Sequence, residues 1–179
     1  MTGGTKGIGR AIVQTLAAEG AHVAFCARNA EEVAQAVKDF PNNGVKISGR
    51  AVDVADGPAL AAWVNDVAAE FGGIDICINN ASAIQLTGTL ATDMKRYDLM
   101  HQINTRGTFL TSKACIPHLK RAANPHVLNL SPPLDFDVKW FANHAAYTLA
   151  KYGMSVFAWS MAEEFRDKGI AFNCLWPRT

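Results

Sequence analysis

The sequence lacks an excess of charge of either sign, because 17 Lys and Arg residues nearly balance 16 Asp and Glu residues and leave a formal net charge of +1. Binding of nucleic acid through a basic surface is therefore not expected. No apolar run approaches the length of a membrane-spanning helix, and no secretory signal is visible. The sequence also lacks repeats and low-complexity tracts, and 49% of its 179 residues are hydrophobic. This composition predicts one domain with a single substantial core.

Cysteine is scarce, and its spacing is not that of a metal site or a disulfide framework. The four cysteines lie far apart, within segments expected to be strands or helices: Cys26, Cys77, Cys115 and Cys174. Buried, reduced thiols in a reducing compartment, the cytoplasm or an organelle matrix, are the better interpretation. The histidines are equally scattered, at positions His22, His101, His118, His126 and His144. No metal site is expected from them.

Glycines cluster at the start of the chain, in the segment TGGTKGIGR over residues 2–10. Apolar residues then recur every fourth position, at Ile8, Ile12 and Leu16, which predicts a helix that ends near Gly20. Glycine lets a backbone approach a pyrophosphate closely, and the amide groups at a helix start face its negative charge. The segment therefore predicts a dinucleotide-binding turn, although its spacing is not that of the general G-x-G-x-x-G fingerprint.

Strands and helices are expected to alternate along the rest of the chain. Strands are expected within 22–27, 45–54, 74–78, 127–130 and 170–176, and helices over about 29–40, 58–71, 92–121 and 144–165. Such alternation is typical of a continuous parallel sheet covered on both faces. The predicted fold class is thus α/β, a doubly wound Rossmann-type parallel sheet.

Both ends of the chain are unusual for this fold. A nucleotide-binding turn normally follows a buried strand, yet only Met1 precedes it, and Trp176 to Thr179 come directly after the last expected strand. We therefore expect residues 1–179 to form a single, partial dinucleotide-binding domain that lacks its first strand, whose place is in the middle of the sheet. Alone, this chain is expected to be poorly stable and inactive.

A tyrosine and a lysine stand four positions apart on the last expected helix. The side chains of Tyr147 and Lys151 should share one helix face, about 6 Å apart. A free tyrosine has a pKa of ~10, and lowering it to ~7 takes roughly 4 kcal/mol, which a partly desolvated ammonium nearby can supply. Such a tyrosine can exchange a proton with a carbonyl or alcohol oxygen while a hydride moves at carbon. The alternative is an exposed Tyr and Lys on a helix surface, and the glycine turn and the alternating elements favour the catalytic interpretation.

With these features together, the chain resembles a short-chain dehydrogenase/reductase over nearly its whole length. The resemblance rests on Thr2-Gly3 with Gly7-Ile8-Gly9, Asp53-Val54, Asn79-Asn80-Ala81 followed by Ser82 in place of a glycine, Asn104, the pair Tyr147 and Lys151, and Asn173 with Pro177. It implies that Tyr147 is the general acid/base and that Lys151 also binds the nicotinamide ribose. It further implies that Asn104 supports a proton-relay water and that Asp53 and Val54 hold the adenine ring.

Several stretches resemble a narrower branch of the family, the hydroxysteroid dehydrogenase-like proteins: residues 80–84, 131–134, 150–155 and 175–179. Members of that branch are NADP-type oxidoreductases. The resemblance implies hydride transfer between NADP(H) and a carbonyl or secondary alcohol of a hydrophobic, lipid- or steroid-like substrate. Two alternatives remain open, an enoyl-thioester reductase and a non-catalytic NADP-binding or scaffold protein.

The choice of NADP has a physical argument of its own. An NAD-preferring protein places an acidic residue at the end of the second strand to bind the ribose hydroxyls, but this chain has Ala27 followed by Arg28 there. Lys6 lies within the glycine turn, and two cations at these places can pair with a 2′-phosphate, unless both are solvated surface charges. The expected cofactor-binding residues are Gly3, Thr5, Lys6, Gly7, Ile8, Gly9, Arg28, Asp53, Val54, Asn80, Ala81, Tyr147, Lys151 and Pro177. The expected catalytic residues are Tyr147, Lys151, Asn104 and Ser131.

Ser131 marks the main departure from the family, which usually has its catalytic serine one position later, where this chain has Pro132. Ser131 can take that role if the prolines bend the chain toward the site. Otherwise it bonds only to local backbone, and Tyr147 or a substrate-bound water polarises the carbonyl. Losing one such donor costs around 3 kcal/mol of barrier. A second departure is Arg178, where the family has a glycine beside the nicotinamide amide.

The loop before Tyr147 and the long helices complete the expectations. Trp140, Phe141 and His144 either line a substrate pocket or pack the loop. The resemblance implies a homo-oligomer formed through the helices over 92–121 and 144–165. It also implies that a last strand and a substrate-covering segment are missing after Thr179.

Overall fold

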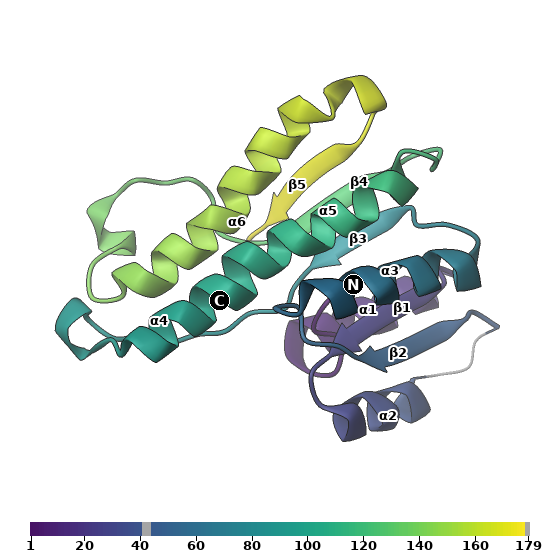
Figure 1. Ribbon diagram of the computed structural model, residues 1–179, viewed down its shortest axis with the longest axis horizontal. Coiled ribbons are helices and arrows are strands. Elements are labelled where there is room, and N and C mark those ends of the chain that lie inside the picture. The colour runs from purple at the N-terminus through teal and green to yellow at the C-terminus, as the bar shows by residue number, and fades with distance from the viewer. Residues whose placement is uncertain (41–43, 178–179) are drawn as a thin grey trace.

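The computed structural model describes residues 1–40 and 44–177. Five strands are arranged as two parallel sheets: β1 (Val23–Ala27) with β2 (Ile47–Ala51), and β3 (Ile76–Asn79), β4 (His126–Leu130) and β5 (Ala171–Leu175) in the order β3-β4-β5 (Figure 1). All pairings are parallel, and β4 lies between β3 and β5. The predicted α/β fold with parallel strands is confirmed.

The described residues also form six α-helices: α1 (Gly7–Ala18), α2 (Ala30–Asp39), α3 (Gly57–Phe71), α4 (Met94–Met100), α5 (Gly107–Leu119) and α6 (Ala145–Glu164). Short 3-10 helices lie at Thr89–Ala91, Val138–Trp140 and Arg166–Lys168. Local chemistry explains several ends. The side chain of Asn29 accepts hydrogen bonds from the first amides of α2, Asp56 caps α3, and Gly72 ends α3 in the left-handed conformation.

The helix expected over residues 92–121 is interrupted. A π-helical segment, His101–Arg106, separates α4 from α5, and the amide of Gly107 bonds to the carbonyl oxygen of Gln102 five residues earlier. A glycine is required at this junction, since a Cβ on Gly107 would lie 2.9 Å from the side chain of Val54. A π-helical turn holds one more residue than an α-helical turn. This segment contains Asn104, one of the expected catalytic residues.

Both faces of the sheets are covered, as alternate residues of β1 show. Phe25 packs with Val13 of α1 and Val33 of α2 in one hydrophobic cluster. Its neighbour Cys26 belongs to a larger cluster on the other face, to which α3, α5 and α6 contribute residues such as Leu119. This is the double cover expected of the fold.

The buried face of α1 is shifted by one residue from the expected one. The pattern placed Ile8, Ile12 and Leu16 toward the core, but Ile8 is 48% exposed. The buried residues of α1 are Gly9, Val13 and Ala17. The helix adopts this rotation because Gly9 packs against the glycine turn itself, more closely than a side chain permits.

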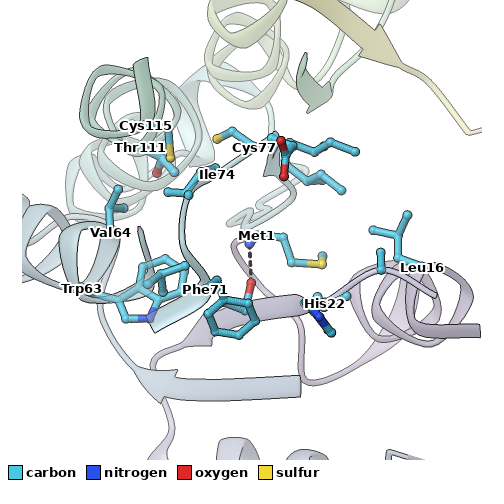
Figure 2. A pocket seen from close by; sticks show the side chains of 18 residues that line it. Met1, Leu16, His22, Trp63, Val64, Phe71, Ile74, Cys77, Thr111 and Cys115 are labelled. Carbon is cyan, nitrogen blue, oxygen red and sulfur yellow. Dashed lines mark hydrogen bonds between the residues drawn. The ribbon is translucent and has the colours of Figure 1, made fainter. Parts of the chain in front are cut away.

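The first residues of the chain lie between the two sheets. The amide of Thr2 donates to the carbonyl oxygen of Ile78 in β3 at 2.9 Å, and the amide of Cys26 in β1 donates to that of Met1 at 3.0 Å. The amino group of Met1 donates to the carbonyl oxygen of Ala24 at 2.6 Å (Figure 2). These residues thus bond to β1 on one side and to β3 on the other.

Beyond Met1, β1 and β3 flank a cavity of about 260 Å³ (Figure 2). Its lining is largely apolar and includes Leu16, Trp63, Val64, Phe71, Ile74 and Cys77. The continuous sheet expected from the sequence is therefore replaced by two sheets. Among the described residues, Met1–Gly3 lie at the position between them where the first strand was expected.

The cysteines agree with the expected buried thiols, whereas Nε2 of His101 is buried without a hydrogen-bond partner among the described residues. Cys26, Cys77 and Cys115 are buried, Cys174 is partly buried, and all four are free thiols. Burial raises the pKa of Cys26 to about 12. Within 1–40 and 44–177, no group of three or more His, Cys, Asp and Glu residues is placed to hold a metal ion. Over the same ranges, no helix has the length and apolar character needed to cross a membrane.

Candidate active site

The glycine turn closes tightly on the start of α1. The backbone angle φ is +73° at Gly3 and +55° at Gly7, values that residues with side chains rarely adopt. A Cβ on Gly9 would lie 1.9 Å from the carbonyl oxygen of Gly3, so only glycine fits there. Lys6 precedes α1 and makes no side-chain cap hydrogen bond to the helix in the described structure. The first amides of α1 are therefore the kind of groups that bind a phosphate.

Asn80 ties this turn to the end of β3. Its side-chain amide donates to the carbonyl oxygens of Thr2 at 3.1 Å and Gly3 at 2.8 Å. The hydroxyl of Thr2, which is buried, accepts from the amides of Asn80 at 3.1 Å and Ala81 at 3.0 Å. The glycine turn and the Asn80-Ala81 segment, both expected to bind the cofactor, are thus held together by four hydrogen bonds.

The two cations expected near a 2′-phosphate differ in their surroundings. The ammonium of Lys6 lies 3.3 Å from a carboxylate oxygen of Glu32, and the hydroxyl of Thr5 donates to the other oxygen at 3.4 Å. Both charged groups are exposed, so this ion pair contributes little in water. Arg28 directly follows β1, is exposed, and makes no ion pair with any described residue.

The residues expected near the adenine ring follow β2. Asp53 is exposed, and its carboxylate accepts from the amide of Ala55 at 2.9 Å. Val54 is buried and packs against Gly107 at the start of α5. The turn is therefore rigid on the Val54 side and open to solvent at Asp53.

Asn104 is fully buried in the π-helical segment. Its side-chain oxygen accepts from the amide of Ala83 at 2.7 Å, and its amide nitrogen donates to the carbonyl oxygen of Ala83 at 2.9 Å. This pair of bonds fixes the segment that follows β3. Next to it, Thr105 donates to the carbonyl oxygen of Ala150 in α6 at 3.0 Å, which joins this segment to the helix carrying Tyr147 and Lys151.

Lys151 reaches from α6 to the end of β4. Its ammonium donates to the carbonyl oxygen of Leu130 at 2.5 Å, directly before Ser131. Burial lowers the pKa of Lys151 to about 8. The ammonium keeps further N–H groups beyond the one that bonds to Leu130.

Tyr147 lies one turn before Lys151, partly buried at the start of α6. Burial raises the pKa of its phenol above the ordinary value. The expected lowering of this pKa by Lys151 is therefore not found. The physical reason is that Lys151 directs its ammonium to the Leu130 carbonyl, while desolvation disfavours the phenolate.

Ser131 is buried at the carboxyl end of β4, with an exposed fraction of 2%. Its amide donates to the carbonyl oxygen of Leu175 in β5 at 3.1 Å. Its hydroxyl has no hydrogen-bond partner among the described residues. An unpaired buried hydroxyl costs roughly 1–3 kcal/mol, and the Ser131 hydroxyl therefore keeps its capacity to donate a hydrogen bond.

The loop between β4 and α6 is packed mainly by its own aromatic residues. Phe141 stacks obliquely on Tyr152, with ring centroids 4.9 Å apart, and the indole of Trp140 donates to Asp135 at 2.7 Å. Phe141 thus packs the loop against α6, whereas Trp140 remains 48% exposed. His144 lies within 2.9 Å of the Thr148 hydroxyl.

Two residues on which the family resemblance rests lie in β5 or just after it, and neither is buried. Asn173 and Pro177 are exposed, and Asn173 pairs in the sheet with Leu128. Arg178, the second departure from the family pattern, lies outside the described residues.

Comparison with known proteins agrees with this geometry. The sequence profile described as short chain dehydrogenase matches residues 1–179. The chain belongs to the short-chain dehydrogenase family. Its glycine turn, Asn104, Lys151 and Ser131 all lie near the carboxyl ends of the parallel strands, where ligands of such sheets bind.

Relatives of this short-chain dehydrogenase include the expected branch. Hydroxysteroid dehydrogenase-like protein 2 of Danio rerio is 50% identical over 186 residues, which cover 100% of this chain and 45% of that protein. The Homo sapiens protein of the same name is 47% identical, and the match covers 100% of this chain and 44% of that protein. The chain therefore spans less than half the length of these curated relatives.

Solved structures support the same family. A short chain dehydrogenase from Mycobacterium thermoresistibile has a TM-score of 0.95 and 46% identity, and the match covers 99% of this chain and 66% of that one. A metagenomic short-chain oxidoreductase in complex with NADP has a TM-score of 0.89 and 27% identity, with 99% and 79% covered.

One buried polar network of this short-chain dehydrogenase was missed by the sequence reasoning. The side-chain amide of Asn79 donates to Asn129 at 2.8 Å and to Ser112 at 3.1 Å, and the amide of Asn129 donates to the carbonyl oxygen of Met154 at 2.9 Å. The network joins β3, β4, α5 and α6 beneath the site. Its sequence signals were the polar residues Asn79 and Asn129 in the largely apolar strands β3 and β4.

Proposed function

We propose that this chain forms the nucleotide-binding and hydride-transfer part of an NADP-dependent oxidoreductase. Its reaction transfers a hydride between NADP(H) and a carbonyl or secondary alcohol of a hydrophobic substrate. The observation that carries the proposal is the placement of Lys151, whose ammonium holds the carbonyl of Leu130 beside the buried, unpaired hydroxyl of Ser131. Tyr147 precedes Lys151 by one turn of the same helix.

The residues present fit a dinucleotide. The glycine turn leaves no space for a Cβ at Gly9, and α1 starts without a side-chain cap, as a pyrophosphate site requires. Gly3, Thr5, Gly7, Ile8 and Gly9 would hold the pyrophosphate and its ribose. Asp53 with Val54, Asn80 with Ala81, and Pro177 would hold the adenine and nicotinamide ends.

In the proposed reaction, a bound nicotinamide supplies or accepts the hydride. Tyr147 donates its phenolic proton to the carbonyl oxygen during reduction and takes the alcohol proton during oxidation. Ser131 donates a hydrogen bond to the same oxygen, which stabilises the charge that develops there. Lys151 would bind the nicotinamide ribose through the N–H groups that Leu130 leaves free. Because both polar atoms of the Asn104 side chain bond to Ala83, we assign Asn104 to holding the segment after β3.

The preference for NADP rests on Arg28 and Lys6. The exposed guanidinium of Arg28 follows β1 where an NAD-preferring protein has a carboxylate. Lys6 reaches the same region, because its partner Glu32 lies in the first turn of α2, directly after Arg28 and Asn29. The NADP complex of the metagenomic oxidoreductase is consistent with this choice.

A hydrophobic substrate is supported by exposed apolar side chains in the segments that follow the strands. They are Ile84 and Leu86 after β3, Phe136 and Trp140 after β4, and Trp176 after β5. Exposed apolar side chains in the segments at the ligand end of such a sheet suit a hydrophobic substrate.

The domain organisation and assembly are also part of the proposal. Residues 1–179 form one dinucleotide-binding domain, whose packing runs without a break through α3, α5, α6 and the sheets. The protein forms a homo-oligomer through α5 and α6, which carry the exposed residues Phe109, Leu149 and Trp159. The four free thiols fit the cytoplasm or another reducing compartment.

Titration with NADPH and NADH, followed by nicotinamide fluorescence, tests the proposal on this chain and on a version extended at both ends to the length of its relatives. The extended version is used for every measurement of turnover. NADPH should bind at least tenfold more tightly, and Arg28→Asp should remove this preference by repelling the 2′-phosphate. Turnover of NADPH with benzil, an apolar aromatic diketone, should be abolished by Tyr147→Phe while NADPH binding is kept. Turnover that survives Tyr147→Phe would contradict the acid/base role, and equal binding of the two nucleotides would contradict the choice of cofactor.

A further inference from the structure

Three hydroxyl groups on one face of α6 bond to the loop that carries Ser131. Thr148 donates to the carbonyl oxygen of Trp140 at 2.8 Å, Tyr152 donates to that of Asp135, and Ser155 donates to that of Pro132 at 2.5 Å. The spacing of four and three residues places the three hydroxyls in a row along the helix. All three side chains are buried, with exposed fractions of 6%, 7% and 3%.

The three hydroxyls of α6 supply hydrogen bonds in place of those that the backbone of the loop cannot donate. Pro132 and Pro133 have no amide hydrogen, so the chain directly after Ser131 cannot be fixed by donating from its backbone. The carbonyl groups on both sides of Ser131 are instead held by α6, that of Leu130 by Lys151 and that of Pro132 by Ser155. The amide of Ser131 is held by β5.

The two segments in contact are two of the four stretches that resemble the narrower branch of the family. One is Ser131–Leu134, where Pro132 stands at the usual serine position. The other is Ala150–Ser155, which contains Tyr152 and Ser155. Their contact across the loop means that the change to proline and the two hydroxyls of α6 act as one unit.

We propose that Ser155 and Tyr152 are positioning residues that hold Ser131 at the hydride-transfer site. Ser155 fixes the Pro132 carbonyl and so sets the direction of the Ser131 side chain. Tyr152 fixes the loop three residues further on, at Asp135, and supports Phe141 with its ring. This inference rests on the proposed function, in which Ser131 donates to the reacting oxygen.

A double-mutant cycle tests this role, with NADPH and benzil as the probes. Ser131→Ala should lower kcat by about 100-fold, as loss of one such donor does. Ser155→Ala should lower kcat by about tenfold and leave KM for NADPH unchanged, since the hydroxyl of Ser155 bonds to the Pro132 carbonyl and not to a residue expected to bind the cofactor. In the Ser131→Ala background, Ser155→Ala should have no further effect, because the group it positions is gone. Ser160→Ala, an exposed serine of the same helix, serves as the control.

Other outcomes separate the inference from the proposed function. Equal losses from Ser155→Ala in both backgrounds, or no loss in either, would overturn the positioning role. If Ser131→Ala leaves kcat unchanged while Tyr147→Phe abolishes turnover, the inference fails and the proposed function stands. If neither substitution affects turnover, both fail.

A measurement independent of activity supports the same test. Tyr152→Phe removes only the hydroxyl, so amide hydrogen exchange over residues 135–138 should become at least fivefold faster. Tyr147→Phe, on the same helix, should leave that exchange unchanged. Unchanged exchange in Tyr152→Phe would show that the loop is held by other contacts and would overturn the role of Tyr152.

Discussion

The ammonium of Lys151 donates a hydrogen bond to the carbonyl oxygen of Leu130 across 2.5 Å, from the middle of α6 to the end of β4. This contact holds the charge beside Ser131 rather than beside the phenol of Tyr147, one turn away. It also explains why burial sets the direction of both pKa shifts. Burial lowers the pKa of Lys151 to about 8 and raises that of Tyr147. A ribose hydroxyl would have to share this ammonium with Leu130.

The lowered pKa of Lys151 predicts a loss of activity in mild alkali. The charged form is present below about pH 8 and is lost as the pH rises through that value. The ratio kcat/KM for NADPH, measured with excess benzil, reports the groups of the free protein and should fall above about pH 8. In Lys151→Arg the charge persists to a pH above ~12, so the fall should move to higher pH even if the overall rate is lower. If kcat/KM falls at the same pH in both proteins, the group that loses its proton there is not residue 151.

The ion pair between Lys6 and Glu32 predicts that Glu32 weakens NADPH binding. Its carboxylate lies 3.3 Å from the ammonium that should face the 2′-phosphate. Glu32→Gln removes a negative charge there and should tighten NADPH binding by about threefold to tenfold at low salt, with little effect on NADH. Glu31→Gln, an exposed neighbour on the same helical turn, is the matched control. Equal gains from both substitutions would indicate a general charge effect rather than a specific one.

Much of the fold was predictable because its signals are local. The strands that became β1, β4 and β5 were expected within about two residues, and Asn29 caps the helix that was expected to begin near residue 29. These features depend on apolar runs and on a side chain that bonds to its own helix. The pairing of Tyr147 and Lys151 on one face also follows from helix geometry alone.

The features that sequence reasoning got wrong depend on contacts between distant segments. The buried face of α1 is set by the approach of Gly9 to Gly3, which no hydrophobic pattern encodes. The direction of the Lys151 ammonium depends on where β4 ends. In each case a backbone carbonyl from another part of the chain decides the outcome, and such groups carry no signal in the sequence.

The cavity between β1 and β3 predicts that an apolar strand joined to Met1 would stabilise the protein. Met1–Gly3 already bond to both sheets, and the cavity continues from Met1 between the same edges. An added segment of about five alternating apolar residues would bury apolar area and pair both edges, and the melting temperature should rise by about 5–10 °C. A Gly- and Ser-rich segment of the same length should give no such rise. Equal melting temperatures for the two extended proteins would contradict the prediction.

The contact between Gly9 and Gly3 predicts that the glycine turn tolerates no side chain at position 9. A Cβ there would lie 1.9 Å from the Gly3 carbonyl oxygen and 2.4 Å from Nδ2 of the Asn80 side chain. Gly9→Ala should therefore push the turn away from β3, break the bonds of Asn80, and weaken NADPH binding at least 100-fold, as measured by nicotinamide fluorescence.

Gly57→Ala is the matched control, because a Cβ at that helix start meets only Leu110 at an ordinary 3.6 Å. Since alanine is also the better helix former, Gly57→Ala should leave NADPH binding unchanged and the free energy of unfolding equal or slightly higher. Wild-type affinity in Gly9→Ala would mean that the turn relaxes without cost, and that the close approach is not what shapes the nucleotide site.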